Sequence, residues 1–155
     1  GVPWHVAKAI AKTSCKVGRE ANYVVGQKPY KEPAKFEDSC SLSHARFEYY
    51  EEKRTKESHY HLNAPSYGWL GNAMRLNRYL EKTGWKKIAA PVMLFSAGKD
   101  NLVSNAEQER FVRKLNKNRP GSAELVKFPE SKHEIFNAGS DIAEEYWEKV
   151  FSFFE

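Results

Sequence analysis

The hydrophobic pattern changes near residue 88, from helical spacing to an alternation of strands and helices. Residues 90–97 form a continuous apolar run, which is typical of a strand buried on both faces of a parallel sheet. Residues 123–128 alternate between apolar and polar side chains, which predicts a second strand. A helix is predicted between these strands and another from about Asp141. Strand, helix, strand and helix in this order predict an α/β fold with a right-handed parallel unit.

Both of these helices carry recognisable signals. Ser104 is followed three residues later by Glu107, which is a capping box and predicts the start of the first helix. The second helix carries an apolar stripe that we expect to face the core, formed by Ile142, Tyr146, Trp147, Val150, Phe151 and Phe154. Because two strands alone cannot bury both faces of a sheet, we expect further strands to lie upstream, outside this chain.

The first 85 residues show a mainly helical pattern. Residues 6–12 and 46–54 each have helical spacing, and the two prolines within residues 26–33 break any helix between them. A third amphipathic helix is predicted after the loop at residues 63–68, with apolar positions from Trp69 to Leu80. The chain therefore divides into a helical region, 1–85, and a strand–helix region, 86–155.

Composition and charge narrow the class of protein. Of 155 residues, 41% are hydrophobic and 29% charged, which favours a folded domain over a disordered chain. The net charge of +5 is interleaved with acids, as in residues 51–57, so no nucleic-acid partner is expected. Cys15 and Cys40 lack a Cys-x-x-Cys spacing, and free thiols in the cytoplasm are the default expectation. No apolar run has the length of a membrane span.

The loops that follow the two predicted strands carry an acid and a histidine. Asp100 follows the first strand, and His133 follows the second. An acid that holds an imidazole in one tautomer, and an imidazole that takes a proton from a serine, are two thirds of a nucleophilic triad. Glu130 and Glu134 are rival orienters of His133, and we rank them below Asp100. No serine of this chain stands in Gly-x-Ser-x-Gly, so the chain lacks the nucleophile of that triad.

Two further sets of residues are candidates for a functional role. His59 and His61 have a spacing that suits a strand, but no carboxylate or cysteine stands at helpful spacing nearby, so no metal and no other cofactor is expected. Several aromatic residues lie close together in the sequence. They either line a pocket for an acyl chain or glycerol, or pack in the core, and the sequence leaves both interpretations open. They are Tyr49, Tyr50, Tyr60, Tyr67 and Trp69.

Four stretches carry a family resemblance, namely residues 42–50, 64–70, 91–103 and 131–135. Together they resemble the lysophospholipase L2 and monoacylglycerol lipase branch of the α/β-hydrolases. In that branch a helical cap precedes the sixth strand. The resemblance implies that residues 1–85 are mainly a cap or lid region and that 86–155 are the C-terminal strand–helix units of the hydrolase core.

The same resemblance implies roles for single residues. Asp100 matches the triad acid and His133 the triad base. If the aromatic residues line a pocket, Tyr67 and Trp69 are the ones expected to contact substrate. The family's serine elbow and oxyanion loop would both precede this sequence. We therefore expect the chain alone to be inactive, because neither an attacking oxygen nor the main oxyanion donors are present.

The function expected from this resemblance is hydrolysis of carboxylic esters of lipids, by a lysophospholipase or monoacylglycerol lipase. Its partners would be a lipid ester, the inner membrane surface as a peripheral contact, and a second copy paired through an exposed sheet edge. An esterase, thioesterase or peptidase of the same fold stays open, because the triad does not fix the substrate. The alternative from another class is a non-catalytic module with a cap that binds a partner or a lipid.

Overall fold

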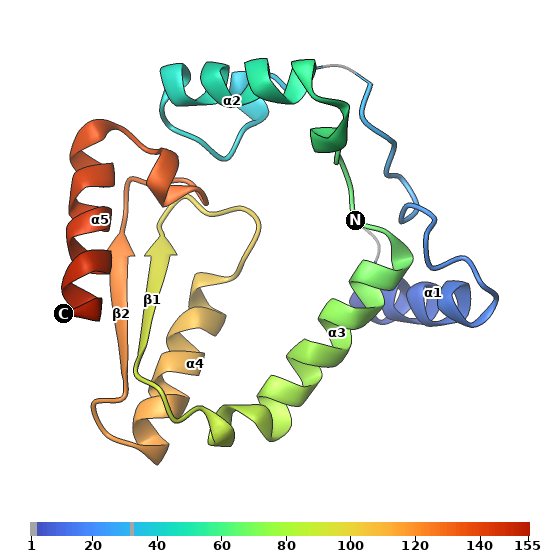
Figure 1. The fold of residues 1–155 in the computed structure, drawn as a ribbon. Coiled ribbons are helices and arrows are strands. Elements are labelled where there is room, and N and C mark those ends of the chain that lie inside the picture. Colours follow the sequence, from blue (N-terminus) through green and yellow to red (C-terminus); the bar gives the residue numbers. More distant parts are fainter. Residues whose placement is uncertain (1–2, 32) are drawn as a thin grey trace. The chain divides into compact units, whose positions relative to one another are not determined.

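The computed structural model describes residues 3–31 and 33–155, which form two compact units. The first unit contains described residues up to 31 together with 54–87, and the second contains 33–53 and 88–155. The helices and strands in Figure 1 are α1 (Trp4–Lys16), α2 (His44–Lys56), α3 (Tyr67–Lys82), β1 (Val92–Ala97), α4 (Asn105–Asn118), β2 (Ala123–Phe128) and α5 (Ser140–Phe154). The assignment of 1–85 as a cap and 86–155 as core stays a prediction.

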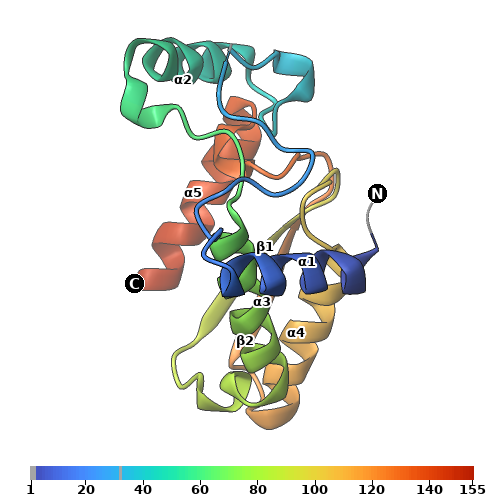
Figure 2. The same cartoon turned by 90° about the vertical axis from the view of Figure 1, so that its right-hand side faces the viewer.

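The second unit is built on a parallel pair of strands. β1 and β2 align with Val92 opposite Ala123 and Ala97 opposite Phe128. The strands are joined through α4, and Figures 1 and 2 show α4 and α5 on opposite sides of the strand pair. The predicted α/β class, both strands and their parallel pairing are thereby confirmed.

The capping box predicted at the start of α4 is only half formed. The Ser104 hydroxyl accepts a hydrogen bond from the Glu107 backbone N–H at 3.3 Å, as expected for the N-terminal residue of a capping box. The Glu107 carboxylate does not complete the box, because it binds the Arg110 guanidinium one turn further along the helix. The start of α4 is therefore fixed by the serine, and its first turn carries an additional ion pair.

The core of the second unit lies against the C-terminal halves of the strands. Its members are Ala97, Val126, Phe128 and Ile135, with Met93, Phe95, Ile142 and Tyr146 packed against them. Full burial of β1 on both faces was expected, but Val92–Phe95 are only half-buried, because the structure pairs β1 with one neighbouring strand.

The apolar stripe of α5 is covered over only part of its length. Ile142 and Tyr146 pack on the core, whereas Phe151 is 63% and Phe154 81% exposed. The expectation that the whole stripe faces the core is therefore wrong for the last turns. Trp147 and Phe151 stack on each other instead, with ring centroids 5.9 Å apart.

The first unit is built on α1 packed against α3. Ala11 of α1 is fully buried, and a Cβ atom on Gly71 of α3 would make ordinary van der Waals contact with the Cys15 sulfur at 3.6 Å. The predicted α3 helix is present but begins at Tyr67, inside the segment 63–68 that was expected to be a loop. The Ser66 hydroxyl caps it by accepting a hydrogen bond from the Trp69 N–H at 3.2 Å. Within the described residues every helix is too short or too polar to span a bilayer.

Candidate catalytic pair at the strand ends

The loops that follow β1 and β2 are held together by backbone hydrogen bonds. The N–H of Gly98 donates to the Phe128 carbonyl at 2.9 Å, and the N–H of Lys99 donates to the Ser131 carbonyl at 2.9 Å. The Lys99 ammonium group also binds the Glu130 carboxylate at 2.6 Å. Parallel pairing therefore continues past the strands themselves, into the segments that lead to the acid and the histidine.

Asp100 is fixed by three hydrogen bonds. Its Oδ1 atom accepts from the backbone N–H groups of Leu102 at 2.8 Å and Val103 at 3.1 Å. Its Oδ2 atom lies 2.8 Å from Nδ1 of His133. The carboxylate side chain is only 3% exposed, so its orientation is set by the loop that it closes.

These contacts lower the pKa of Asp100. Burial by itself would raise the pKa of this carboxyl, because burial disfavours the charged form. The hydrogen bonds from His133, Leu102 and Val103, together with the charge of the imidazole, outweigh burial and hold the pKa below its ordinary value. Asp100 is therefore a carboxylate at neutral pH and acts only as a hydrogen-bond acceptor.

The ionised carboxylate determines the tautomer of His133. Because a carboxylate only accepts, Nδ1 of His133 carries the proton of their hydrogen bond, so in the neutral form of the imidazole Nε2 carries the lone pair. The His133 side chain is 37% exposed, and Nε2 has no hydrogen-bond partner among the described residues. An oriented imidazole with a free basic nitrogen can remove a proton from a hydroxyl group.

The two rival acids are engaged elsewhere. Glu130 binds Lys99, as described above, and Glu134 accepts a hydrogen bond from the Asn137 side-chain amide at 2.9 Å. The partner of the imidazole is thus Asp100, in agreement with the ranking drawn from the sequence.

A segment ahead of α2 braces the histidine loop, and sequence reasoning missed it. The Ser41 hydroxyl donates to the Asn137 carbonyl at 2.7 Å, and the Glu134 N–H donates to the Cys40 carbonyl at 3.1 Å. The Arg46 guanidinium adds a bond to the Phe136 carbonyl at 2.6 Å. The only signal in the sequence would have been the serine-rich stretch itself, which is equally typical of a loop.

The charge of Asp100 influences the pKa of the nearby Cys40 thiol. Burial raises the pKa of the Cys40 thiol, and the charges of Glu134 and Asp100 raise it further, while Lys132 acts in the opposite direction. The thiol therefore stays protonated at neutral pH. A low-pKa thiolate is the reactive form of cysteine, so this environment does not favour Cys40 as a nucleophile.

The predicted substrate contacts lie in the first unit. Tyr67 is 7% exposed and its hydroxyl accepts a hydrogen bond from the Val25 N–H at 3.2 Å, whereas Trp69 is 63% exposed. Tyr67 thus packs within its own unit, and the substrate role of both residues stays a prediction. His61 stacks on Tyr30, and the described residues contain no group of three metal-ligating side chains.

A parallel strand–helix unit with an acid and a histidine on successive strand ends belongs to the α/β-hydrolase class. Residues 16–139 match the family model described as serine aminopeptidase, S33, and since this match covers most of the chain, the chain belongs to that family. No curated protein and no solved structure matches the chain. Membership supports hydrolase activity in general and does not fix the substrate.

Proposed function

We propose that this chain supplies the acid and the base of a serine hydrolase that cleaves carboxylic esters of lipids. Lysophospholipids or monoacylglycerols are the proposed substrate class. The observation that carries the proposal is the 2.8 Å hydrogen bond between a buried, ionised Asp100 and an exposed His133. The nucleophilic serine would lie outside these 155 residues, because no Gly-x-Ser-x-Gly occurs within them.

In the proposed cycle, Nε2 of His133 takes the proton of the serine hydroxyl as the serine oxygen attacks the ester carbonyl. Asp100 stabilises the imidazolium that forms. The imidazolium then gives its proton to the departing alcohol, which leaves an acyl-enzyme. A water molecule deprotonated by the same histidine hydrolyses the acyl-enzyme and releases the fatty acid. No metal or organic cofactor takes part in these steps.

Exposed apolar side chains support the lipid part of the proposal. Leu62 is 81%, Val25 68% and Trp69 63% exposed, and all three belong to the first unit. Contact with the acyl chain of a substrate or with the inner membrane surface would give these side chains an apolar environment. We propose a cytoplasmic protein in peripheral contact with that membrane.

The test compares substrates on a longer parent protein that carries this chain. We expect release of fatty acid from a lysophospholipid or a monoacylglycerol, and loss of nearly all of it in His133→Ala. The matched control is Glu130→Gln, because Glu130 binds Lys99 and leaves His133 untouched. The 155-residue chain by itself should release no fatty acid. Release of fatty acid by the 155-residue chain alone would show that the nucleophile lies within this chain, contrary to the proposal.

A peptidase is the second candidate, and the description of the matching family favours it. Cleavage of an aminoacyl anilide in preference to both lipid esters would replace the lipid proposal with this one. A third outcome, binding of lipid without cleavage of any ester or amide by the parent, would favour a non-catalytic module.

A further inference from the structure

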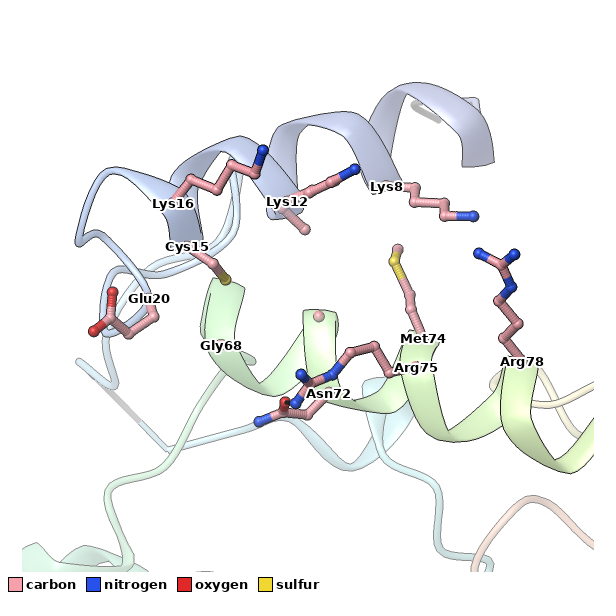
Figure 3. Close-up of a pocket in the computed structure, with 12 residues that line it drawn as sticks. Lys8, Lys12, Cys15, Lys16, Glu20, Gly68, Asn72, Met74, Arg75 and Arg78 are labelled. Carbon is pink, nitrogen blue, oxygen red and sulfur yellow. Dashed lines mark hydrogen bonds between the residues drawn. The ribbon is translucent and has the colours of Figure 1, made fainter. Parts of the chain in front are cut away.

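A groove of about 610 Å³ lies between α1 and α3 within the first unit (Figure 3). Its floor is apolar and is formed by Ala11, Cys15, Gly71 and Met74. Figure 3 shows the side chains of Cys15 and Met74 pointing into the gap between the helices. A volume of this size is typical of sites that bind small molecules.

The walls of the groove carry an excess of positive charge. Five cationic side chains line it, from Lys8, Lys12, Lys16, Arg75 and Arg78, against the single acid Glu20. Figure 3 shows Lys8 and Arg78 converging at one end, while Glu20 lies at the other. Arg75 donates to the Asn72 side chain, and within the described residues Lys8 and Arg78 have no acidic partner.

The cationic side chains concentrate like charge along the groove. Lys8, Lys12 and Lys16 repeat every fourth residue, so they lie in a row on one face of α1 and repel one another. Arg78 adds a further positive charge from α3 at the same end as Lys8. A bound anionic group would remove this repulsion, and an apolar chain would cover the floor.

From these observations we propose that the groove binds a single-chain lipid bearing a phosphate group. The phosphate would lie between Lys8 and Arg78, and the acyl chain would lie along the floor past Met74. A free phosphate ion would leave the apolar floor uncovered, and a neutral lipid would leave the cations unpaired. The groove is lined by residues of the first unit only, whereas the hydrolytic proposal is argued from Asp100 and His133 of the second unit.

Three probes separate the two parts of the ligand, and calorimetric titration of the full 155-residue chain measures their binding. The first is lauroyl lysophosphatidic acid below its micelle concentration. The second is 1-lauroylglycerol, which has the chain without the charge, and the third is glycerol 3-phosphate, which has the charge without the chain. We expect the first to bind at least about tenfold more tightly than either of the others.

Variants then place the ligand in the groove. Lys8→Gln with Arg78→Gln should weaken binding of the phosphate lipid by about fivefold or more, because each removes a cation from the phosphate end. Lys82→Gln with Lys117→Gln removes the same charge from exposed positions that do not line the groove, and should leave affinity unchanged. Met74→Trp, which fills the floor, should weaken binding of both lipids, and circular dichroism checks that each variant is folded.

Equal affinity for the phosphate lipid and 1-lauroylglycerol would overturn the proposal. An equal loss of affinity in the groove double variant and in the control double variant would overturn it as well. Raising the salt concentration from about 0.05 M to about 0.5 M should weaken binding of the phosphate lipid more than binding of the neutral lipid, because salt screens the charged contacts.

Discussion

Gly98 and Pro129 approach so closely that a Cβ atom on Gly98 would lie 2.1 Å from the Pro129 carbonyl oxygen. The contact joins the backbones that leave β1 and β2, and it allows the Gly98 N–H to reach the Phe128 carbonyl. Any side chain at position 98 must push the two loops apart. One of these loops carries Asp100 and the other carries His133, so the close approach at Gly98 lies on the backbone path to both the acid and the base.

Gly98→Ala should lower the free energy of unfolding by about 2 kcal/mol or more, because the atom that blocks the new methyl group is backbone and cannot turn aside. Urea unfolding measures the change. Gly71→Ala is the matched control, since its Cβ would make only ordinary contact with Cys15 and alanine favours a helix by about 1 kcal/mol over glycine. Equal effects of the two substitutions would contradict this account.

Asp100→Asn should change the tautomer of His133. A carboxylate only accepts, so it selects the Nδ1–H form, whereas an amide can also donate and admits the Nε2–H form. ¹⁵N spectra of labelled histidine in the 155-residue chain distinguish the two forms. In a parent enzyme the same substitution should lower kcat by about 10⁴-fold, the loss seen when a triad acid is replaced in this way. Glu134→Gln should alter neither quantity, because Glu134 binds Asn137.

The lowered pKa of Asp100 predicts how stability depends on pH. Its folded pKa lies below the ordinary value of 3.8, so the folded state favours the ionised form. The resulting stability is fully present above about pH 4 and is lost as the pH falls through the folded pKa. Asp100→Asn lacks this contribution at every pH. The difference in urea midpoint between the two proteins should therefore shrink on acidification, and a constant difference would contradict the shift.

Ser41→Ala should destabilise the brace on the histidine loop. Ser41 is 2% exposed, and its hydroxyl both donates to the Asn137 carbonyl and accepts from the Ser43 N–H at 3.1 Å. Loss of a buried hydroxyl with two partners should cost about 1–3 kcal/mol in the free energy of unfolding. Ser152→Ala, at an exposed position of α5, should change it by less than about 0.5 kcal/mol.

Local features of this chain were predictable from the sequence because their causes are local. The alternation at Ala123–Phe128 placed β2 at its observed bounds, and Ser104 placed the start of α4. The acid and histidine could be paired because each directly follows a strand. Their hydrogen bond agrees with that pairing, and their catalytic role stays a prediction.

Features that depend on distant contacts were not predictable. The bond from Ser41 to Asn137 joins residues 96 positions apart, and no pattern marks either partner. In the sequence Gly98 looks like any other turn glycine, so its close approach to Pro129 could not be predicted. An amphipathic stripe shows which face of a helix is apolar, but not whether another element covers it, and for this reason the exposure of Phe154 was missed.

The strand pair should drive self-association of the 155-residue chain. Each of β1 and β2 has one partner strand in the described structure, so each presents a second edge with backbone groups available for pairing. We expect the weight-average mass in sedimentation equilibrium to rise with concentration, and a clean monomer at high concentration would contradict this.

A variant separates the sheet edge from the exposed end of α5 as the cause of association. Phe151→Lys places a charge on a helix position that is 63% exposed and leaves the strands unchanged. If the strand edges pair, this variant should associate like the unaltered chain. If it becomes monomeric, the aromatic face of α5 holds the copies together and edge pairing is wrong. Hydrogen exchange at β1 and β2 gives an independent measure, because edge pairing should slow exchange there as the concentration rises.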